Sequence, residues 1–505
     1  MSGEGLDRLR ERGQAFTEEI SREGYLAYSG LKASADLQSI YEKYRDVLNE
    51  DSLALTLESF RNAKAGTDEH RSSRALLEWQ VEAQASRQLA ALDEREIEWE
   101  GSAVVRTRYG EEISYQAAPI EIANSSDRDR RLAIDDARAE VVETEHSPLR
   151  LERLQREKEI IEQIGIAPGY NGTFEALTGI SLSSLASECA AFLRDTEPMW
   201  SDVLPDVLRK SLGLKVGEAT RADAIALLRA SQFDAAFPGA SMEETIRRQM
   251  DEMGIDATAN GRVIFDVGDR PGKRSRAFCS PVEVPDEVYL VLRPHGGQSD
   301  YTTFLHELGH ALHFAYARRD YPFEFRWLGD NSVTESYAML LDHRMQDRGW
   351  LLRYTGLGST HVDEFLRSAG FEELHFLRRY CAKLLYEVQV YSGDLDWRQM
   401  PDLYAETLTS ATSFKYRPVD AFIDMDPRFY SARYLRAWQL QSVVDESLVN
   451  NFDIDWFRNP GAGPWLVREL LAEGQRETAD EIAQRAGSLL SFSPLIRKIE
   501  KLLGA

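Results

Sequence analysis

Two histidines four residues apart, with a glutamate directly after the first, form the pattern in this sequence whose chemistry is easiest to predict. His306, Glu307 and His310 make an H-E-x-x-H motif within residues 300–320. On a helix, residues four apart lie about one turn along the same face, so both imidazoles could reach one metal ion. The side chain of Glu307 is rotated around the helix axis by one residue step from that of His306. Its carboxylate would therefore lie beside the ion, in a position to accept a proton from an attacking water.

The residues around this motif favour a buried helix. The apolar positions are Phe304, Leu305, Leu308, Ala311, Leu312 and Ala315. The motif is short, and histidines at this spacing also occur as hydrogen-bonded residues of an ordinary helix. A catalytic zinc has three protein ligands and one open position. A metal site therefore needs a further ligand from elsewhere in the chain.

Two residues are candidates for the third ligand. His313 shares a helix face with His310, but successive turns of a straight helix diverge along its axis, so one ion is hard to reach from three of them. The metzincin pattern is absent, because it needs Gly at position 313 and His or Asp at position 316. Glu335 is the better candidate, since it follows a predicted loop at 321–330 and opens a second helical pattern. Two helices joined by such a loop can place a carboxylate opposite the paired histidines.

Glu335 also has an alternative role at the start of its helix. Ser332-Val-Thr-Glu335 fits a capping box, in which Glu335 would bond to the backbone of Ser332. Beside a histidine pair that lacks a third ligand, we favour ligation. With His306, His310 and Glu335 as ligands, and no second ligand cluster apparent, we expect one Zn²⁺ per chain.

Helical periodicity dominates the chain up to about residue 250 and again after residue 298, which predicts a mainly α fold. Between these parts, the runs RVIFDV, SRAFCSPVEV and EVYLVLRP are short and rich in β-forming residues. They predict one small antiparallel sheet directly before the H-E-x-x-H helix. The stretch 96–122 alternates around a Tyr-Gly-Glu-Glu turn and predicts a β-hairpin.

Composition narrows the class of protein. Of 505 residues, 43% are apolar and 29% are charged, the balance of a globular protein. The formal net charge of −24 argues against nucleic acid as a partner, because such a surface repels phosphate. Three cysteines without a CxxC pair, Cys189, Cys279 and Cys381, indicate neither a disulfide framework nor a thiolate zinc site. The start lacks a secretory signal and no run approaches the ~18 apolar residues of a membrane helix, so we expect a cytoplasmic protein without a membrane partner.

The motif and its surroundings resemble a known family. HELGHALH is followed by VTESYAML, with Glu335 twenty-five positions after His310, which is similar to the thimet oligopeptidase and oligopeptidase F family of zinc metallopeptidases. GKRSRAFCSPV at 272–282 resembles the GK-x-x-GAFC-like stretch of the oligopeptidase F branch. DPRFYSARYLRAW at 426–438 resembles the tyrosine-bearing segment of the family. The resemblance covers about residues 260–440.

This resemblance implies a fold and an activity. The expected fold is a two-lobed helical shell around a deep channel, with an N-terminal helical lobe at 1–205 and the catalytic region at 206–505. Enzymes of this kind cut short unfolded peptides and spare folded proteins. Short peptides are therefore the expected substrates, and Glu307 is the expected general base for a zinc-dependent endopeptidase.

Two tyrosines carry over from family tyrosines that hold the scissile carbonyl oxygen. By their four-residue spacing they are Tyr430 and Tyr434, and the alternative is an amphipathic helix with buried rings. The family often has a His shortly before the first tyrosine, whereas residues 423–426 here read Ile-Asp-Met-Asp. A further family tyrosine would fall at Ala437. The resemblance therefore predicts the two tyrosines, but not all the residues with which the family binds its substrate.

Further substrate contacts are expected from an extended run and from one histidine. Val288, Leu290 and Leu292 belong to a run that could bind a peptide as an added strand, and the alternative is a buried strand. His313 is the other candidate for a substrate contact.

Three other functions fit parts of the pattern. A zinc carboxypeptidase of the Taq type has H-E-x-x-H with a distant Glu, and TES at 334–336 is similar to its HES, although its His-Pro-Phe stretch is not found here. A catalytically silent peptide-binding protein would keep the fold without the metal. A zinc hydrolase could also act on substrates other than peptides. Products from a peptide with a blocked C-terminus separate the carboxypeptidase from an endopeptidase, and zinc content separates the silent protein from both.

Overall fold

The chain forms two compact units, each built from segments that are distant in sequence. The computed structural model describes residues 2–393 and 396–504. The first unit contains Met1–Gln84, Gln232–Leu366 and Arg436–Leu495, and the second contains Ala85–Ser231, Arg367–Leu435 and Ile496–Ala505. The predicted lobes, 1–205 and 206–505, stay a prediction, and positions 205 and 206 both lie in helix α10 (Glu197–Leu212) of the second unit. The resemblance also implies a deep channel between two lobes, and this channel stays a prediction.

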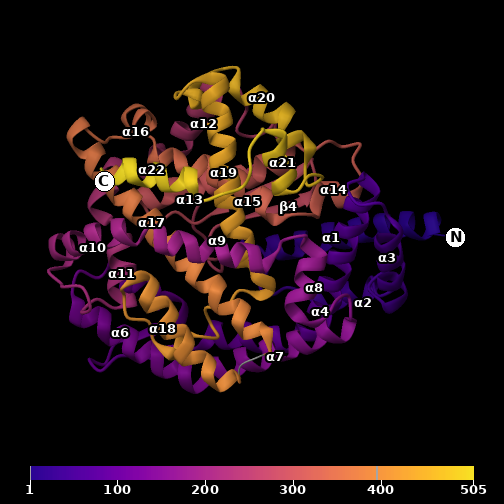
Figure 1. Ribbon diagram of the computed structural model, residues 1–505, viewed down its shortest axis with the longest axis horizontal. Helices are drawn as coiled ribbons and strands as arrows, with labels where there is room; N and C mark the ends of the chain where they lie inside the picture. Colours follow the sequence, from indigo (N-terminus) through magenta and orange to yellow (C-terminus); the bar gives the residue numbers. More distant parts are fainter. Residues whose placement is uncertain (1, 394–395, 505) are drawn as a thin grey trace. The chain divides into compact units, whose positions relative to one another are not determined.

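Helices make up most of both units, which confirms the predicted mainly α fold (Figure 1). Those of the first unit are α1 (Ser2–Tyr28), α2 (Leu37–Lys43), α3 (Glu50–Asn62), α12 (Met242–Met253), α13 (Gln298–Tyr316), α14 (Phe323–Trp327), α15 (Asn331–Asp342), α16 (Arg348–Tyr354), α20 (Ala462–Glu469) and α21 (Ala479–Arg485). Those of the second are α5 (Ala118–Asn124), α6 (Arg128–Val141), α7 (Ser147–Ile164), α8 (Gly169–Thr178), α9 (Leu182–Asp195), α10, α11 (Arg221–Leu228) and α18 (Met400–Thr412). The chain passes from one unit to the other within α4 (Asp68–Ser102), α17 (Ser359–Ser392), α19 (Tyr430–Phe452) and α22 (Ser493–Leu503).

The sheet of the first unit has the three predicted strands in an order that the sequence did not suggest. They are β3 (Val263–Val267), β4 (Phe278–Glu283) and β5 (Glu287–Leu292). The order is β3-β5-β4, with β3 parallel and β4 antiparallel to β5. The sheet is therefore mixed, and the prediction of an antiparallel sheet is wrong for the β3–β5 pair.

A buried lysine stabilises the end of the parallel pair. Lys273 lies between β3 and β4 in sequence, and its Nζ donates to the carbonyl oxygens of Asp266 at 2.7 Å, Gly268 at 2.9 Å and Leu292 at 3.0 Å. Because β3 and β5 are parallel, their carboxyl ends meet at the same edge. One ammonium group can therefore bond to both ends, and the segment after β3 is fixed there before the chain enters β4.

Helices α13 and α1 pack on the sheet and bury its side chains. The Tyr289 ring stacks on Tyr25 of α1, with centroids 3.8 Å apart. The Phe304 ring of α13 packs edge-on against Phe265 of β3, with centroids 5.1 Å apart. Phe265 pairs with Leu290, the residue after Tyr289, and successive residues of a strand point to opposite faces, so the two helices pack on opposite faces of the sheet. The helix that carries the two histidines is thereby anchored on a sheet.

A glycine allows α13 to pack closely against α15 (Figure 1). A Cβ atom on Gly309 would lie 2.5 Å from Cα of Ala338 and 2.5 Å from the carbonyl oxygen of Tyr337. These are backbone atoms that cannot turn aside. Any larger residue at 309 would therefore separate the two helices, and the distance between their facing side chains depends on this glycine.

The second unit contains the predicted hairpin. Strands β1 (Val104–Arg106) and β2 (Glu112–Ser114) are antiparallel, which confirms the central part of the hairpin predicted at 96–122. Its first residues are instead helical, because α4 continues to Ser102. Within the described parts of the chain, no single helix is long and apolar enough to cross a membrane, although the bent pair α8 and α9 passes the same test together by length and composition alone.

Candidate metal centre

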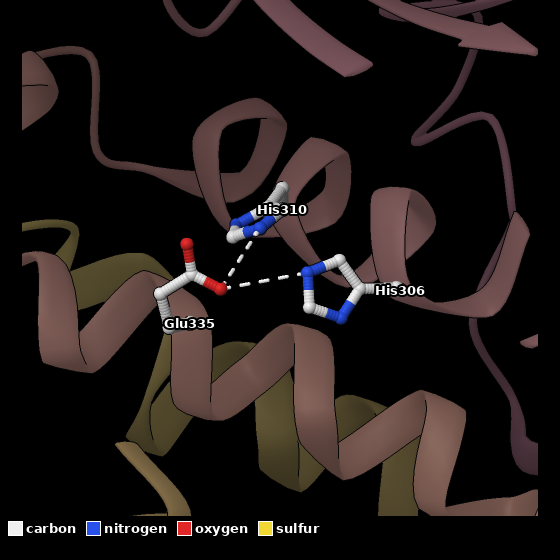
Figure 2. A group of neighbouring side chains, drawn as sticks. All are labelled: His306, His310 and Glu335. Atoms are coloured by element: carbon white, nitrogen blue, oxygen red, sulfur yellow. Dashed lines mark ion pairs between the residues drawn. The ribbon is translucent and has the colours of Figure 1, made fainter. Parts of the chain in front are cut away.

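Helices α13 and α15 bring the three predicted ligands together. The Oε2 atom of Glu335 lies 3.4 Å from Nε2 of His306 and 3.5 Å from Nε2 of His310. Figure 2 shows the imidazoles on one helix and the carboxylate on the other, turned toward one another. The three ligand atoms all lie within 4.8 Å of one another. Residues predicted from two separate stretches of sequence thus converge on one point.

These separations fit a tetrahedral zinc ion. Zinc binds imidazole nitrogen and carboxylate oxygen at about 2.0–2.2 Å, and two ligand atoms of a tetrahedron then lie about 3.3–3.5 Å apart. The distances of 3.4 Å and 3.5 Å from Glu335 to the two histidines fall in this range. Two imidazoles and one carboxylate are also a donor set that catalytic zinc accepts, with the fourth position open. The residues present therefore fit a zinc ion.

The second nitrogen of each imidazole is held by a residue that the sequence did not single out. Nδ1 of His306 lies 2.8 Å from Oδ2 of Asp342, and Nδ1 of His310 lies 2.9 Å from Oγ1 of Thr334. An ionised carboxylate only accepts, so His306 donates to Asp342 through Nδ1 and its Nε2 keeps a lone pair for a metal. Both partners belong to α15, one residue before and seven residues after Glu335. Thr334 and Asp342 are thus about two turns apart on the helix that carries Glu335, and this spacing could have been found in the sequence.

The start of α15 decides between the two roles of Glu335. The N-cap is Asp330, whose side chain accepts the backbone N–H of Ser332 at 2.9 Å. Ser332 therefore lies inside the helix and is not its cap. The capping-box alternative for Glu335 is wrong, because the cap lies two residues earlier and the Glu335 carboxylate turns to the histidines.

Electrostatics at this centre favour positive charge. Burial lowers the pKa of His306, but the hydrogen bond to Asp342 and the nearby Glu335 outweigh burial and hold this pKa well above its ordinary value. Burial raises the pKa of Glu335, but His310 and His306 outweigh it and hold the pKa of this carboxyl well below its usual range. The carboxylates of Glu335 and Asp342 thus favour positive charge at this centre, as a site for a divalent metal must.

Glu307 faces a different neighbour from the two histidines. Helix α13 packs against β4 as well as against α15. Burial, with the nearby Glu307 carboxylate adding to it, raises the pKa of the Cys279 thiol on β4 well above its ordinary value. Glu307 therefore lies near β4, while His306 and His310 turn toward α15. Its role as the general base stays a prediction.

Two groups of predicted substrate contacts are wrong. His313 is 1% exposed, and its Nε2 lies 2.9 Å from the carbonyl oxygen of Gly474, so it is a buried packing residue. Val288, Leu290 and Leu292 are at most 3% exposed, and their strand, β5, is paired on both sides. A peptide cannot add to a strand without an open edge. The edges of this sheet are β3 and β4.

The two predicted tyrosines lie in the second unit. Tyr430 is the first residue of α19 and Tyr434 lies one turn later. Their ring centroids are 5.1 Å apart, and the Tyr434 centroid is 5.5 Å from that of Tyr380 on α17. The three rings thus form one aromatic cluster. The role of Tyr430 and Tyr434 toward substrate stays a prediction, since the predicted metal ligands belong to the first unit.

A second group of side chains has the composition of a metal site but is already paired. Glu96, Glu100 and His146 offer ligand atoms within 4.8 Å of one another. The Nε2 atom of His146 lies 2.9 Å from Glu96 Oε1, and its Nδ1 lies 3.2 Å from the Tyr115 hydroxyl. Arg150 donates to the other oxygen of Glu96 at 3.3 Å. A guanidinium group competes with a metal ion for that carboxylate, so we still expect one zinc per chain.

Solved structures of peptidases resemble the whole chain. An oligoendopeptidase F structure matches with a TM-score of 0.72 and 13% identity, covering 99% of this chain and 92% of that chain. An oligoendopeptidase F from Bacillus anthracis matches with a TM-score of 0.63 and 14% identity, over 95% and 83%. An M32 carboxypeptidase from Deinococcus radiodurans matches with a TM-score of 0.63 and 15% identity, over 99% and 100%.

This chain shares the fold of these peptidases. The similarity extends over 95% or more of this chain in each comparison, so it includes α13, α15 and the sheet beside them. No protein-family model and no curated protein match the sequence. The fold and the geometry of the centre are therefore the basis of the functional argument.

Proposed function

We propose that this protein is a zinc-dependent peptidase that hydrolyses short peptides. His306, His310 and Glu335 hold the ion, and Glu307 is the general base. The observation that carries the proposal is the position of Glu335, whose Oε2 lies 3.4 Å and 3.5 Å from the two imidazole nitrogens. Hydrogen bonds to Asp342 and Thr334 fix those imidazoles, so the geometry does not depend on mobile side chains.

The proposed mechanism assigns one role to each group. A bound zinc supplies Lewis acidity, which activates a water near neutral pH and polarises a peptide carbonyl. Glu307 accepts the proton of the attacking water and passes it to the leaving amine. Tyr430 or Tyr434 donates a hydrogen bond to the carbonyl oxygen as negative charge develops on it. Asp342 and Thr334 keep both imidazoles oriented throughout.

The mode of cleavage has two candidates, and each has support. The resemblance of HELGHALH and VTESYAML to the oligopeptidases favours cleavage within short peptides. The M32 carboxypeptidase with the same fold favours removal of C-terminal residues. We propose the first. A short peptide with an amidated C-terminus tests it, because an endopeptidase cuts such a peptide and a carboxypeptidase does not.

Metal analysis combined with a peptide assay tests the proposal as a whole. The purified protein should contain one zinc per chain and cleave short quenched peptides, and a chelator should remove both properties until zinc is restored. His306→Ala, His310→Ala and Glu335→Ala should each lose most of the metal. Full zinc content in Glu335→Ala would remove Glu335 from the ligand set, and cleavage that survives complete zinc removal would overturn the metal mechanism.

A further inference from the structure

A buried glutamate in the second unit holds the segment on both sides of Tyr430. Glu387 of α17 is 0% exposed. Its Oε1 accepts the backbone N–H of Asp426 at 2.9 Å, and its Oε2 is hydrogen-bonded to the hydroxyl of Ser431. Asp426 lies four residues before Tyr430, and Ser431 lies directly after it. One side chain thus connects the approach to α19 with its first turn.

The segment that Glu387 holds has an unusual backbone. Arg428 and Phe429, the two residues before Tyr430, have φ values of 53° and 49°. Residues other than glycine rarely adopt this left-handed region, and they remain in it only where the surrounding structure fixes them. The N–H of Arg428 donates to the hydroxyl of buried Tyr170 at 3.1 Å, which is a second fixed point. The direction in which α19 starts therefore depends on contacts from α17 and α8.

The same helix α17 also supports the tyrosine rings. Tyr380 lies two turns before Glu387 on α17, and its ring centroid is 5.5 Å from that of Tyr434. The Tyr434 ring in turn contacts that of Tyr430, with centroids 5.1 Å apart. Glu387 fixes the backbone of α19 and Tyr380 packs against a side chain of α19. Both contacts act on the helix that carries the two phenols.

We infer that Glu387 is a positioning residue for Tyr430 and Tyr434, which it controls by holding Asp426 and Ser431. The inference rests on the proposed function, in which these phenols donate to the substrate carbonyl oxygen. Glu387 itself is buried and touches no substrate. Its loss lets the first turn of α19 move, and a phenol displaced by a fraction of an ångström no longer meets the developing charge.

Glu387→Met tests the inference, because methionine keeps much of the volume and removes both acceptors. Glu387→Gln is the conservative variant, since its amide oxygen can accept from Asp426 and its NH₂ can donate to Ser431. Ser431→Ala removes one contact and is the alternative if Glu387→Met does not fold. Asp223→Asn is the matched control: Asp223 is a fully buried carboxylate of the same unit, and it pairs with Arg128 and Arg131.

Two measurements decide the inference. Hydrogen exchange at 428–434 should be faster in Glu387→Met and unchanged in Glu387→Gln and Asp223→Asn. At equal zinc content, Glu387→Met should lower kcat on a quenched peptide by roughly tenfold with little change in KM, and Glu387→Gln should restore it. In a Tyr430→Phe/Tyr434→Phe background, Glu387→Met should lower kcat no further, because the groups act together.

The outcomes separate this inference from the proposed function. A full tenfold loss in the double phenylalanine background, or unchanged exchange at 428–434, would overturn the positioning role of Glu387. If the tyrosine variants themselves keep normal kcat, the proposed role of the phenols fails instead. Hydrogen exchange alone then decides whether Glu387 fixes the start of α19.

Discussion

Nδ1 of His306 donates to Oδ2 of Asp342 across 2.8 Å, and Asp342 stands on the same helix as Glu335. Helix α15 therefore supplies the proposed ligand Glu335 and also orients a proposed ligand of α13. A carboxylate behind a metal-bound imidazole fixes its tautomer and makes it a better donor. The geometry of the centre therefore depends on both helices, α13 and α15.

Replacing Asp342 should weaken zinc binding without changing the ligands. Asp342→Ala leaves His306 free to turn and removes the acceptor at Nδ1, so zinc affinity should fall by about 10–100-fold. Competition with a chelator of known affinity measures the change. Thr334→Val tests the equivalent contact at His310. Wild-type affinity in Asp342→Ala would show that the packing of α13 alone orients the imidazole.

Gly309→Ala should weaken the metal centre indirectly, by changing how α13 packs against α15. The added methyl would lie 2.5 Å from the backbone of Ala338, so α15 has to move, and we expect a loss of about 1–3 kcal/mol in the free energy of unfolding together with weaker zinc binding. Gly101→Ala is the control, because this helical position has no atom within 4 Å of the new Cβ. Alanine there should be neutral or stabilise the helix by up to about 1 kcal/mol. Equal zinc affinities in both variants would separate the centre from the α13–α15 contact.

The tyrosines should affect catalysis and not metal binding. A phenol that donates to a developing oxyanion contributes mainly in the transition state, so its loss lowers kcat more than it raises KM. At least one of Tyr430→Phe and Tyr434→Phe should reduce kcat by roughly tenfold or more at unchanged zinc content. Phenylalanine keeps the ring, so residues with a packing role alone would show near-normal kcat in both variants.

Glu387 should make stability depend on pH. Burial raises the pKa of this carboxyl from 4.5 to about 8, and Lys383 opposes this shift while Asp426 adds to it. Arg379 and Asp424, a neighbouring ion pair, face the same region. The folded state therefore keeps a proton that the unfolded chain loses above pH 4.5, so this contribution to stability is complete below pH 4.5 and is lost as the pH rises to about 8.

Glu387→Gln tests this dependence, because the amide stays neutral at every pH. Urea unfolding of both proteins between pH 5 and 8.5 should show the wild type losing stability relative to the variant as pH rises. The difference between the two proteins cancels the other titrating groups. A difference that is constant over this range would mean that Glu387 is ionised in the folded protein throughout.

The features that could be predicted from the sequence are those that depend on local sequence patterns. The H-E-x-x-H helix, the strand runs and the hairpin follow from periodicity and turn residues within a few positions. The role of Glu335 was ambiguous, because it depends on whether α15 begins at Ser332 or after Asp330 and on the close approach at Gly309. The start of a helix is a weak signal, and a helix–helix contact is not visible in sequence at all.

Errors arose where the deciding contact is distant in sequence. The strand with Val288, Leu290 and Leu292 reads as an open strand until β3 and β4 pair on both sides of it. His313 reads as a possible ligand until the carbonyl of Gly474, 161 residues later, is found at its Nε2. Thr334 belongs to the VTESYAML segment and Asp342 lies two residues after it, but neither has a role until α13 packs against α15. Long-range packing, rather than local propensity, decided each case.

The most direct test of the account is the turnover of Glu307→Gln measured with its zinc content. Glutamine keeps the shape of the side chain but cannot accept a proton, so the variant should fold, bind one zinc per chain and lose about 10²–10⁴-fold in kcat on a short quenched peptide. Near-normal turnover in a variant that holds a full equivalent of zinc would contradict the account, because another group would then be the base.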